Sequence, residues 1–166
     1  SADHTFALIL AVTRRITEGD RLIRSREPWV WGPRMLVGLD VSAGATLGIL
    51  GMGRIGQGIA QRASGFRMRV LYHNRSRLPS DVEAACRAQY VDFDTLFAQA
   101  DHLVLVLPYS PAVRHLVDAT AIAKMKPGVR IVNCARGGIV DEQAVAKAIQ
   151  SGHVAGAAFD VFSEEP

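Results

Sequence analysis

The chain has 166 residues, 49% of them hydrophobic, and its 19 Lys and Arg against 16 Asp and Glu give a formal charge of +3. This length and apolar content suit a single folded domain, and they exclude a disordered chain and a disulfide-stapled mini-fold. The basic residues are dispersed without interleaved stacking aromatics, so we expect no nucleic-acid partner. The longest apolar run, Phe6–Val12, is far shorter than the roughly 20 residues that cross a bilayer. We therefore expect a soluble protein with no membrane segment. Cys86 and Cys134 form no metal-binding cluster, so we also expect no metal site and a cytoplasmic location.

Residues 1–45 predict an opening helix followed by an irregular arm. Apolar residues occupy opposite faces of the helix, so it needs neighbours on all sides. A stretch of dispersed arginines follows, and then the apolar segment Trp29-Val30-Trp31, which has no obvious local core. We predict that this arm packs against a second subunit, which gives a homodimer, or against another part of a larger protein. The alternative is that the arm folds back on its own sheet.

From residue 46 onward, short apolar segments alternate with amphipathic ones. Strands are predicted at Thr46–Gly51, Arg69–Asn74, His102–Pro108, Arg130–Ala135 and Val154–Val161, with a weak short strand at Tyr90-Val91. Helices are predicted between them at Ile55–Ala63, Phe93–Ala100, Pro111–Met125 and Asp141–Gln150. Strands such as Leu103–Leu107 are apolar on both faces, so helices must cover both sides of a parallel sheet. Residues 46–166 therefore predict an α/β core of the Rossmann type, a doubly wound parallel sheet with helices on both faces.

A glycine-rich turn joins the first of these strands to a helix. Its spacing, Gly51-x-Gly53-x-x-Gly56, is typical of dinucleotide sites when a strand precedes it and a helix follows, although the glycines alone are a weak signal. Gly51 would make the tight turn, Gly53 would let a pyrophosphate approach the backbone, and Gly56 would let the helix pack closely on the strand. The backbone amides of Arg54 and Ile55 would then face the anion at the positive end of the helix dipole.

The end of the second strand indicates which dinucleotide is preferred. An NAD site has an acidic residue about 20 positions beyond the last glycine, where it binds the adenosine ribose. Here Asn74 stands 18 residues after Gly56, and it has no charge to repel a 2′-phosphate. Arg75 and Arg77 follow and could pair with that phosphate, so we predict that NADP(H) is preferred and that NAD(H) is possible. The alternative is that these arginines belong to a solvated loop.

These motifs together resemble the NAD(P)-binding domain of the D-2-hydroxyacid dehydrogenases, in the branch of the glyoxylate/hydroxypyruvate reductases and 2-ketogluconate reductases. The resemblance covers essentially the whole chain. It is most specific in Asn133–Asp141, which is similar to the family's catalytic arginine loop, and in Ala158–Pro166, which is similar to its glutamate segment. It also implies that residues at or just beyond the carboxyl ends of the third, fourth and fifth predicted strands contact the cofactor, namely Leu107, Pro108, Ser110, Cys134, Ala135, Arg136 and Asp160.

The resemblance implies two catalytic residues, Arg136 and Glu165. Arg136 would pair with the carboxylate and carbonyl oxygens of a 2-keto acid and polarise the carbonyl. Glu165 would hydrogen-bond a catalytic histidine and raise its pKa, so that it stays protonated and can donate its proton. Asp160 would bind the nicotinamide carboxamide, and Cys134 would fill tight space beside the cofactor rather than act as a nucleophile.

The family's catalytic histidine should lie about twenty residues after the glutamate segment, and none of the five histidines stands at the matching position. The substrate-binding domain of the family is also absent from this sequence. We therefore expect this chain to bind cofactor without turning over substrate.

The resemblance implies a reductase that converts a small 2-keto acid to the D-2-hydroxy acid with NADPH. The substrate would be glyoxylate, hydroxypyruvate or 2-ketogluconate. One alternative is a non-catalytic NAD(H)-sensing interaction protein of the same fold, because transcriptional corepressors resemble this family. Another is an S-adenosylmethionine-binding protein that uses the glycine turn, but that hypothesis leaves Arg136 and Glu165 without a role.

Overall fold

The computed structural model describes residues 1–165, and its centre is a parallel six-stranded sheet. Its strands are β1 (Thr46–Leu50), β2 (Arg69–His73), β3 (Ala88–Tyr90), β4 (His102–Leu105), β5 (Val129–Asn133) and β6 (Val154–Phe159). The strand order is β3-β2-β1-β4-β5-β6, and all neighbouring strands pair in parallel. This order reverses direction between β1 and β4, where a doubly wound sheet opens a crevice at the carboxyl ends of its strands. The predicted Rossmann-type fold is confirmed.

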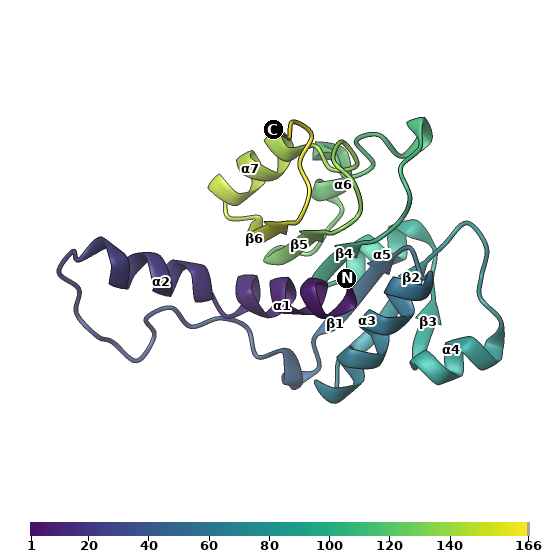
Figure 1. Ribbon diagram of the computed structural model, residues 1–166, viewed down its shortest axis with the longest axis horizontal. Coiled ribbons are helices and arrows are strands. Elements are labelled where there is room, and N and C mark those ends of the chain that lie inside the picture. The colour runs from purple at the N-terminus through teal and green to yellow at the C-terminus, as the bar shows by residue number, and fades with distance from the viewer. Residues whose placement is uncertain (166) are drawn as a thin grey trace.

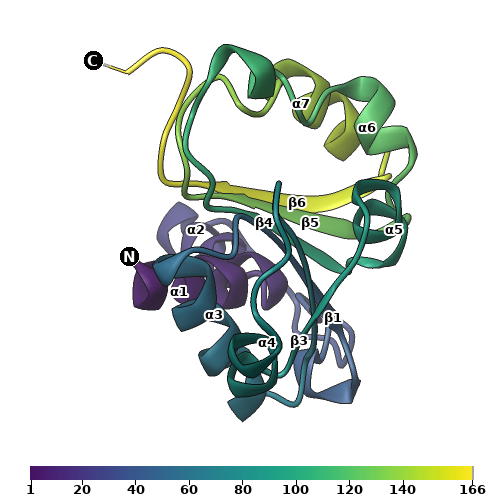
Figure 2. The same cartoon turned by 90° about the vertical axis from the view of Figure 1, so that its right-hand side faces the viewer.

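Helices cover both faces of the sheet (Figures 1 and 2). They are α1 (Ala2–Thr13), α2 (Ile16–Ser25), α3 (Arg54–Gly65), α4 (Ser80–Cys86), α5 (Phe93–Gln99), α6 (Ala119–Ala123) and α7 (Glu142–Gln150), with short 3-10 turns at Val41–Ala43 and Pro111–Val113. Figure 2 shows α1, α3 and α4 on one side of the sheet and α5, α6 and α7 on the other. Within residues 1–165, no helix is long and apolar enough to span a membrane.

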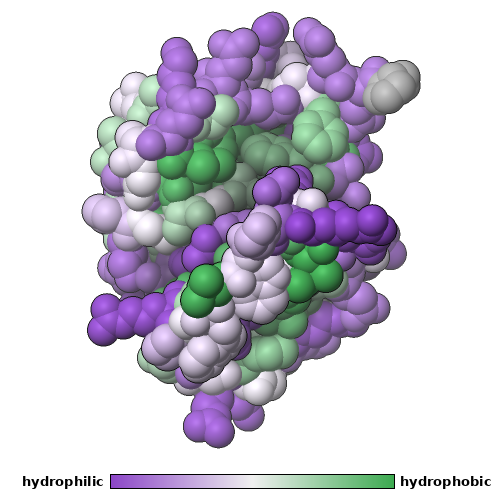
Figure 3. Space-filling view, turned by 90° about the vertical axis from the view of Figure 1, so that its left-hand side faces the viewer, coloured by the Kyte–Doolittle hydropathy of each residue, from purple (hydrophilic) through white to green (hydrophobic). Residues whose placement is uncertain are grey.

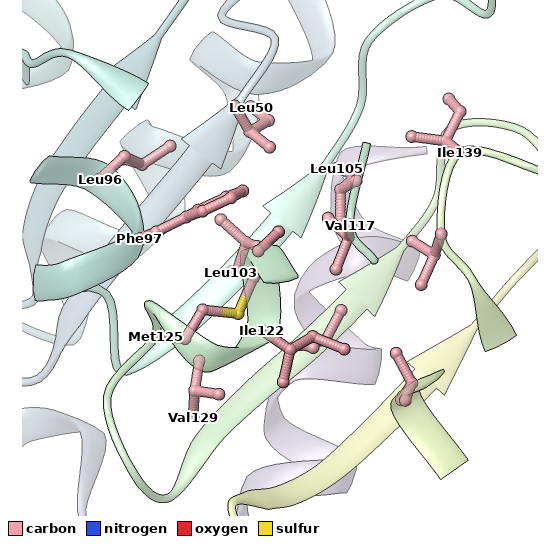
Figure 4. Close-up of a cluster of buried hydrophobic side chains, with 14 of the residues drawn as sticks. Leu50, Leu96, Phe97, Leu103, Leu105, Val117, Ile122, Met125, Val129 and Ile139 are labelled. Atoms are coloured by element: carbon pink, nitrogen blue, oxygen red, sulfur yellow. The ribbon is translucent and has the colours of Figure 1, made fainter. Parts of the chain in front are cut away.

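Alternate residues of the central strands enter two separate hydrophobic cores. In β4, Leu103 and Leu105 face the core under α5, α6 and α7, whereas Val104 faces the core under α1, α3 and α4. Figure 4 shows the first of these cores, where Phe97 of α5 and Met125 converge on Leu103. β4 has an uninterrupted apolar sequence because its side chains on both faces are buried, one face in each core.

The segment predicted as one long helix, Pro111–Met125, is instead two short helical pieces joined by extended chain. Val117 forms an isolated parallel bridge with Val140, and the backbone amide of His115 donates to the carbonyl of Gly138. Asp118 then starts α6 by accepting a hydrogen bond from the amide of Ala121. The apolar residues of this segment are therefore buried by pairing with the chain after β5, which the helical pattern does not reveal.

Several other element boundaries differ from the prediction. The strand predicted to reach Pro108 ends at Leu105, and the weak strand predicted at Tyr90-Val91 is Ala88–Tyr90. The helices α2 and α4 were not predicted. The domain prediction ended at Pro166, which lies outside the described residues.

The first 45 residues divide into a packed helix and an exposed arm. Helix α1 lies against α3, β5 and β6, and it buries Phe6 and Ile9 in the core. Helix α2 has no buried residue and extends away from the sheet (Figure 1). Beyond it, Trp29 is 45% exposed and Trp31 is 74% exposed. Figure 3 faces the end of the molecule from which α2 and the arm project, and it shows apolar side chains at the surface there. In this single chain residues 26–37 do not fold back over the sheet, and the chain returns to the core at Val41 and Ala45, which are buried.

Candidate functional site

The glycine turn has the geometry that a bound dinucleotide needs. Gly51 has a φ of +100°, and an added Cβ there would lie 2.8 Å from the amide nitrogen of Leu107 and 2.9 Å from the carbonyl of Val106. A Cβ at Gly56 would overlap the carbonyl oxygen of Gly51, so α3 packs directly on the end of β1. By contrast, a Cβ at Gly53 would meet no atom within 4 Å. The space that a pyrophosphate would enter is therefore open, while the two flanking glycines are required by the fold.

Helix α3 begins at this open space with its first amides uncapped. Gly53 is the N-cap residue and supplies no side-chain hydrogen bond. Arg54 and Ile55 are exposed, and the first amides of an α-helix have no partner within the helix. These amides are therefore free to face an anion at the positive end of the helix dipole, and the pyrophosphate contact of Arg54 and Ile55 stays a prediction.

The loop after β2 lies beside the glycine turn. The side-chain oxygen of Asn74 accepts a hydrogen bond of 2.6 Å from the amide of Met52, so Asn74 is anchored to the turn itself. Arg75 is exposed, whereas Arg77 makes two hydrogen bonds to Glu83. The structure thus places Asn74 against the glycine turn, and of the two predicted phosphate ligands it leaves Arg75 exposed and pairs Arg77 with Glu83. Neither the Met52 amide nor Glu83 was singled out from the sequence.

The turn after β5 is shaped by Asn133, which is almost fully buried. Its Oδ1 accepts from the amide of Ala135 at 3.0 Å, and its Nδ2 donates to the carbonyl of Arg136 at 3.1 Å. This side chain therefore holds the backbone that presents Arg136, a role that sequence reasoning did not assign. Burial raises the pKa of the Cys134 thiol, which keeps the thiol protonated at neutral pH and agrees with a packing role.

Other predicted cofactor ligands lie at the carboxyl ends of β4 and β6. Leu107 is half-buried, and Pro108 and Ser110 are exposed. Asp160 follows β6, and one of its carboxylate oxygens lies 3.0 Å from Nε2 of His4 in α1. Since the strands are parallel, these residues share the edge of the sheet that carries the glycine turn.

The two predicted catalytic residues line one open pocket of about 610 Å³. The pocket is lined by Tyr109, Arg136, Gly137, Val161, Phe162, Ser163 and Glu165. A Cβ at Gly137 would overlap the carbonyl oxygen of Phe162, so the arginine loop and the glutamate segment approach through a residue that has no side chain. Glu165 accepts a hydrogen bond of 2.9 Å from the amide of Phe162. Arg136 and Glu165 are 29 positions apart in sequence, and the fold brings them to one cavity.

Comparison with known proteins shows which family this chain belongs to. A family model described as "D-isomer specific 2-hydroxyacid dehydrogenase, NAD binding domain" matches residues 6–166. The chain belongs to this family. The family predicted from the sequence motifs is confirmed, and the relatives place this dehydrogenase domain in the glyoxylate reductase branch.

Among the curated relatives of this dehydrogenase domain, glyoxylate reductase from Thermococcus onnurineus is 44% identical over 171 residues, and that from Pyrococcus horikoshii is 43% identical. Each alignment covers 100% of this chain and 50% of the relative. The chain thus spans about half the length of the curated relatives it matches.

Solved structures show the same likeness. A glyoxylate reductase from Paecilomyes thermophila matches with a TM-score of 0.89 and 42% identity, over 99% of this chain and 48% of that chain. A D-lactate dehydrogenase from Aquifex aeolicus, solved in complex with NAD and lactic acid, matches with a TM-score of 0.84 and 31% identity, over 98% of this chain and 47% of that chain.

Proposed function

We propose that this domain binds NADP(H) in preference to NAD(H). The observation that carries the proposal is the uncharged Asn74 at the end of β2, beside the exposed Arg75. A carboxylate at this position would repel a 2′-phosphate, whereas the Nδ2 group of Asn74 can donate to a ribose hydroxyl. The guanidinium of Arg75 offers charge-assisted hydrogen bonds to phosphate, and one such bond is worth about 1.5–3 kcal/mol, or about tenfold or more in affinity.

This preference is tested by exchanging the two residues that carry it. The double variant Asn74→Asp with Arg75→Ala is expected to move the ratio of NADPH to NADH affinity toward NADH by about tenfold or more. The variant Arg69→Ala is a matched control, because it removes an exposed arginine at the start of β2, the opposite end of the strand from Asn74, and is expected to leave the ratio unchanged. An unchanged ratio in the double variant would show that the phosphate is held elsewhere.

We also propose that the protein carrying this domain reduces a small 2-keto acid, namely glyoxylate, hydroxypyruvate or 2-ketogluconate, to the D-2-hydroxy acid in the cytoplasm. The bound nicotinamide cofactor supplies the hydride. Arg136 would hold the substrate carboxylate and polarise its carbonyl, and Asp160 would orient the nicotinamide through its carboxamide. Glu165 would accept a hydrogen bond from an acid/base histidine contributed by another part of the protein and keep it protonated. The shared pocket of Arg136 and Glu165 and the names of the glyoxylate reductases support this proposal.

The exposed arm supports a further proposal, that two copies of the protein form a dimer through residues 1–45. Ile23 of α2 and Val30 and Trp31 of the arm are exposed apolar side chains that a partner would cover. The variant Val30→Ser with Trp31→Ser is expected to shift the sedimentation coefficient from dimer to monomer. The control variant Ile149→Ser changes an exposed apolar residue of α7, outside residues 1–45, and is expected to sediment as the wild type does. A wild-type protein that sediments as a monomer at high concentration would contradict the proposal.

A further inference from the structure

A nearly buried carboxylate, Glu83 of α4, lies behind the loop that follows β2. Its side chain is 10% exposed, and both of its oxygens are paired with Arg77, through Nε at 2.9 Å and Nη2 at 2.8 Å. The hydroxyl of the buried Tyr72 donates a third hydrogen bond to Glu83, at 2.6 Å. Arg77 and then Tyr72 lower the pKa of Glu83, so the carboxylate is ionised at neutral pH.

The same contacts fix the loop at both ends. At its start, Asn74 accepts from the amide of Met52, and at its end the amide of Leu78 donates to the hydroxyl of Tyr72 at 2.9 Å. Arg77 lies between these anchors and uses two of its nitrogens on Glu83, although its side chain is 65% exposed. The two arginines that the sequence offers to a 2′-phosphate are therefore not equivalent, because one of them already has an anionic partner.

We propose that Glu83 sets the cofactor selectivity of this domain by occupying Arg77, which leaves Arg75 as the arginine of this loop that binds the 2′-phosphate of NADP(H). A carboxylate and a phosphate compete for the same N–H donors of a guanidinium group. A bidentate pair with a carboxylate is among the stronger interactions that arginine makes. Glu83 thus limits the preference for NADP(H). It acts through Arg77 and does not itself touch the cofactor, so it is a positioning residue. This inference rests on the proposed NADP(H) function of the site.

The deciding variant is Glu83→Gln, which keeps the size and one oxygen acceptor of the side chain but removes its charge. Calorimetric titration of the chain with NADPH and with NADH, at one fixed ionic strength, isolates the contribution of the 2′-phosphate. The NADPH affinity is expected to rise about tenfold and the NADH affinity to change less than twofold. In the background Arg77→Ala, the same substitution is expected to have no effect on either cofactor, because the released guanidinium is then missing.

Asp81→Asn is the matched control, since Asp81 is an exposed acidic residue on the same helix and forms no hydrogen bond or ion pair with Arg77 within residues 1–165. An equal NADPH gain in this control, or a gain from Glu83→Gln that persists without Arg77, would overturn the proposal in favour of a general charge effect. Equal weakening of both cofactors, or no change, would also overturn it.

Two single variants test the same proposal if Glu83→Gln does not fold. Arg77→Ala is expected to change the NADPH to NADH ratio less than twofold, whereas Arg75→Ala is expected to lower it about tenfold. A lowered ratio in Arg77→Ala would overturn the proposal. A wild-type chain without NADPH preference would refute the proposed cofactor function, yet a Glu83→Gln gain that depends on Arg77 would still establish the role of Glu83. Failure to bind either cofactor would overturn both.

Discussion

The buried histidine at the start of β4 makes the stability of this domain depend on pH. His102 is fully buried, and its Nε2 lies 2.8 Å from Oγ1 of Thr13 at the end of α1. The Thr13 hydroxyl donates its own proton to the carbonyl of Ile9, so it accepts one from Nε2. Nδ1 has no partner among the described residues, and protonation would place an unpaired N–H and a charge in the core.

Burial, and secondarily the charge of Arg130, lowers the pKa of His102 from 6.5 to about 4. The unfolded chain therefore takes up this proton near pH 6.5, whereas the folded chain takes it up only near pH 4. The group has no effect on the free energy of unfolding above this range, and it lowers that free energy as the pH falls through it. Since one pKa unit corresponds to about 1.36 kcal/mol, the loss amounts to about 3 kcal/mol.

Urea unfolding of the wild type and of His102→Gln, followed by circular dichroism between pH 7.5 and pH 4, measures this effect. Glutamine keeps a donor near the position of Nε2 and does not titrate, so the variant is expected to lose about 3 kcal/mol less than the wild type across the range. His115→Gln, which changes an exposed histidine, is the control and is expected to follow the wild type. Parallel pH profiles for the wild type and His102→Gln would refute the reasoning.

Three further predictions concern the glycine turn, the buried hydrogen bond between Thr13 and His102, and the loop that carries Arg136. Gly53→Ala is expected to leave the melting temperature unchanged, because its Cβ would meet open space, and to weaken NADPH binding about tenfold or more. Gly56→Ala is expected to destabilise the fold by about 1–3 kcal/mol, because its Cβ would overlap backbone. Equal melting temperatures for the two variants would contradict this expectation. Thr13→Val is expected to cost about 1–3 kcal/mol in urea unfolding, because it leaves Nε2 of His102 buried without a partner, and an unchanged midpoint would show that this bond contributes nothing. In the protein that carries this domain with its substrate domain, Arg136→Ala is expected to lower kcat/KM for the keto acid about 100-fold while the Kd for NADPH changes less than twofold. Unchanged steady-state kinetics would remove Arg136 from the site.

The fold was predictable because its strongest signals are local. Apolar strands such as Leu103–Leu105 need cover on both faces, and the Gly51-to-Gly56 turn marks a strand that runs into a helix. The break in Pro111–Met125 was not predictable, because it depends on the pairing of Val117 with Val140, and no periodicity reports a contact of this kind. A helix as short as α4, with about two turns, is also difficult to predict, because so few residues do not establish a helical repeat of apolar positions.

The candidate site was predictable as a set of residues but not as a set of contacts. The motifs select Arg136 and Glu165, and the structure shows that both residues line one cavity. Nothing in the sequence indicates that Asn133 shapes the arginine loop or that Glu83 pairs with Arg77, because a polar residue near a strand end has many possible partners until the backbone is known.

The central claim is that this domain is a dinucleotide site with a preference for the 2′-phosphate. Direct titration of the chain with NADPH and with NADH, each at two salt concentrations, tests it most directly. We expect NADPH to bind more tightly, and its advantage to shrink at the higher salt concentration because the exposed Arg75 is screened. Equal binding of the two cofactors, or tighter binding of NADH, would contradict the claim and return Arg75 to the role of a solvated loop residue.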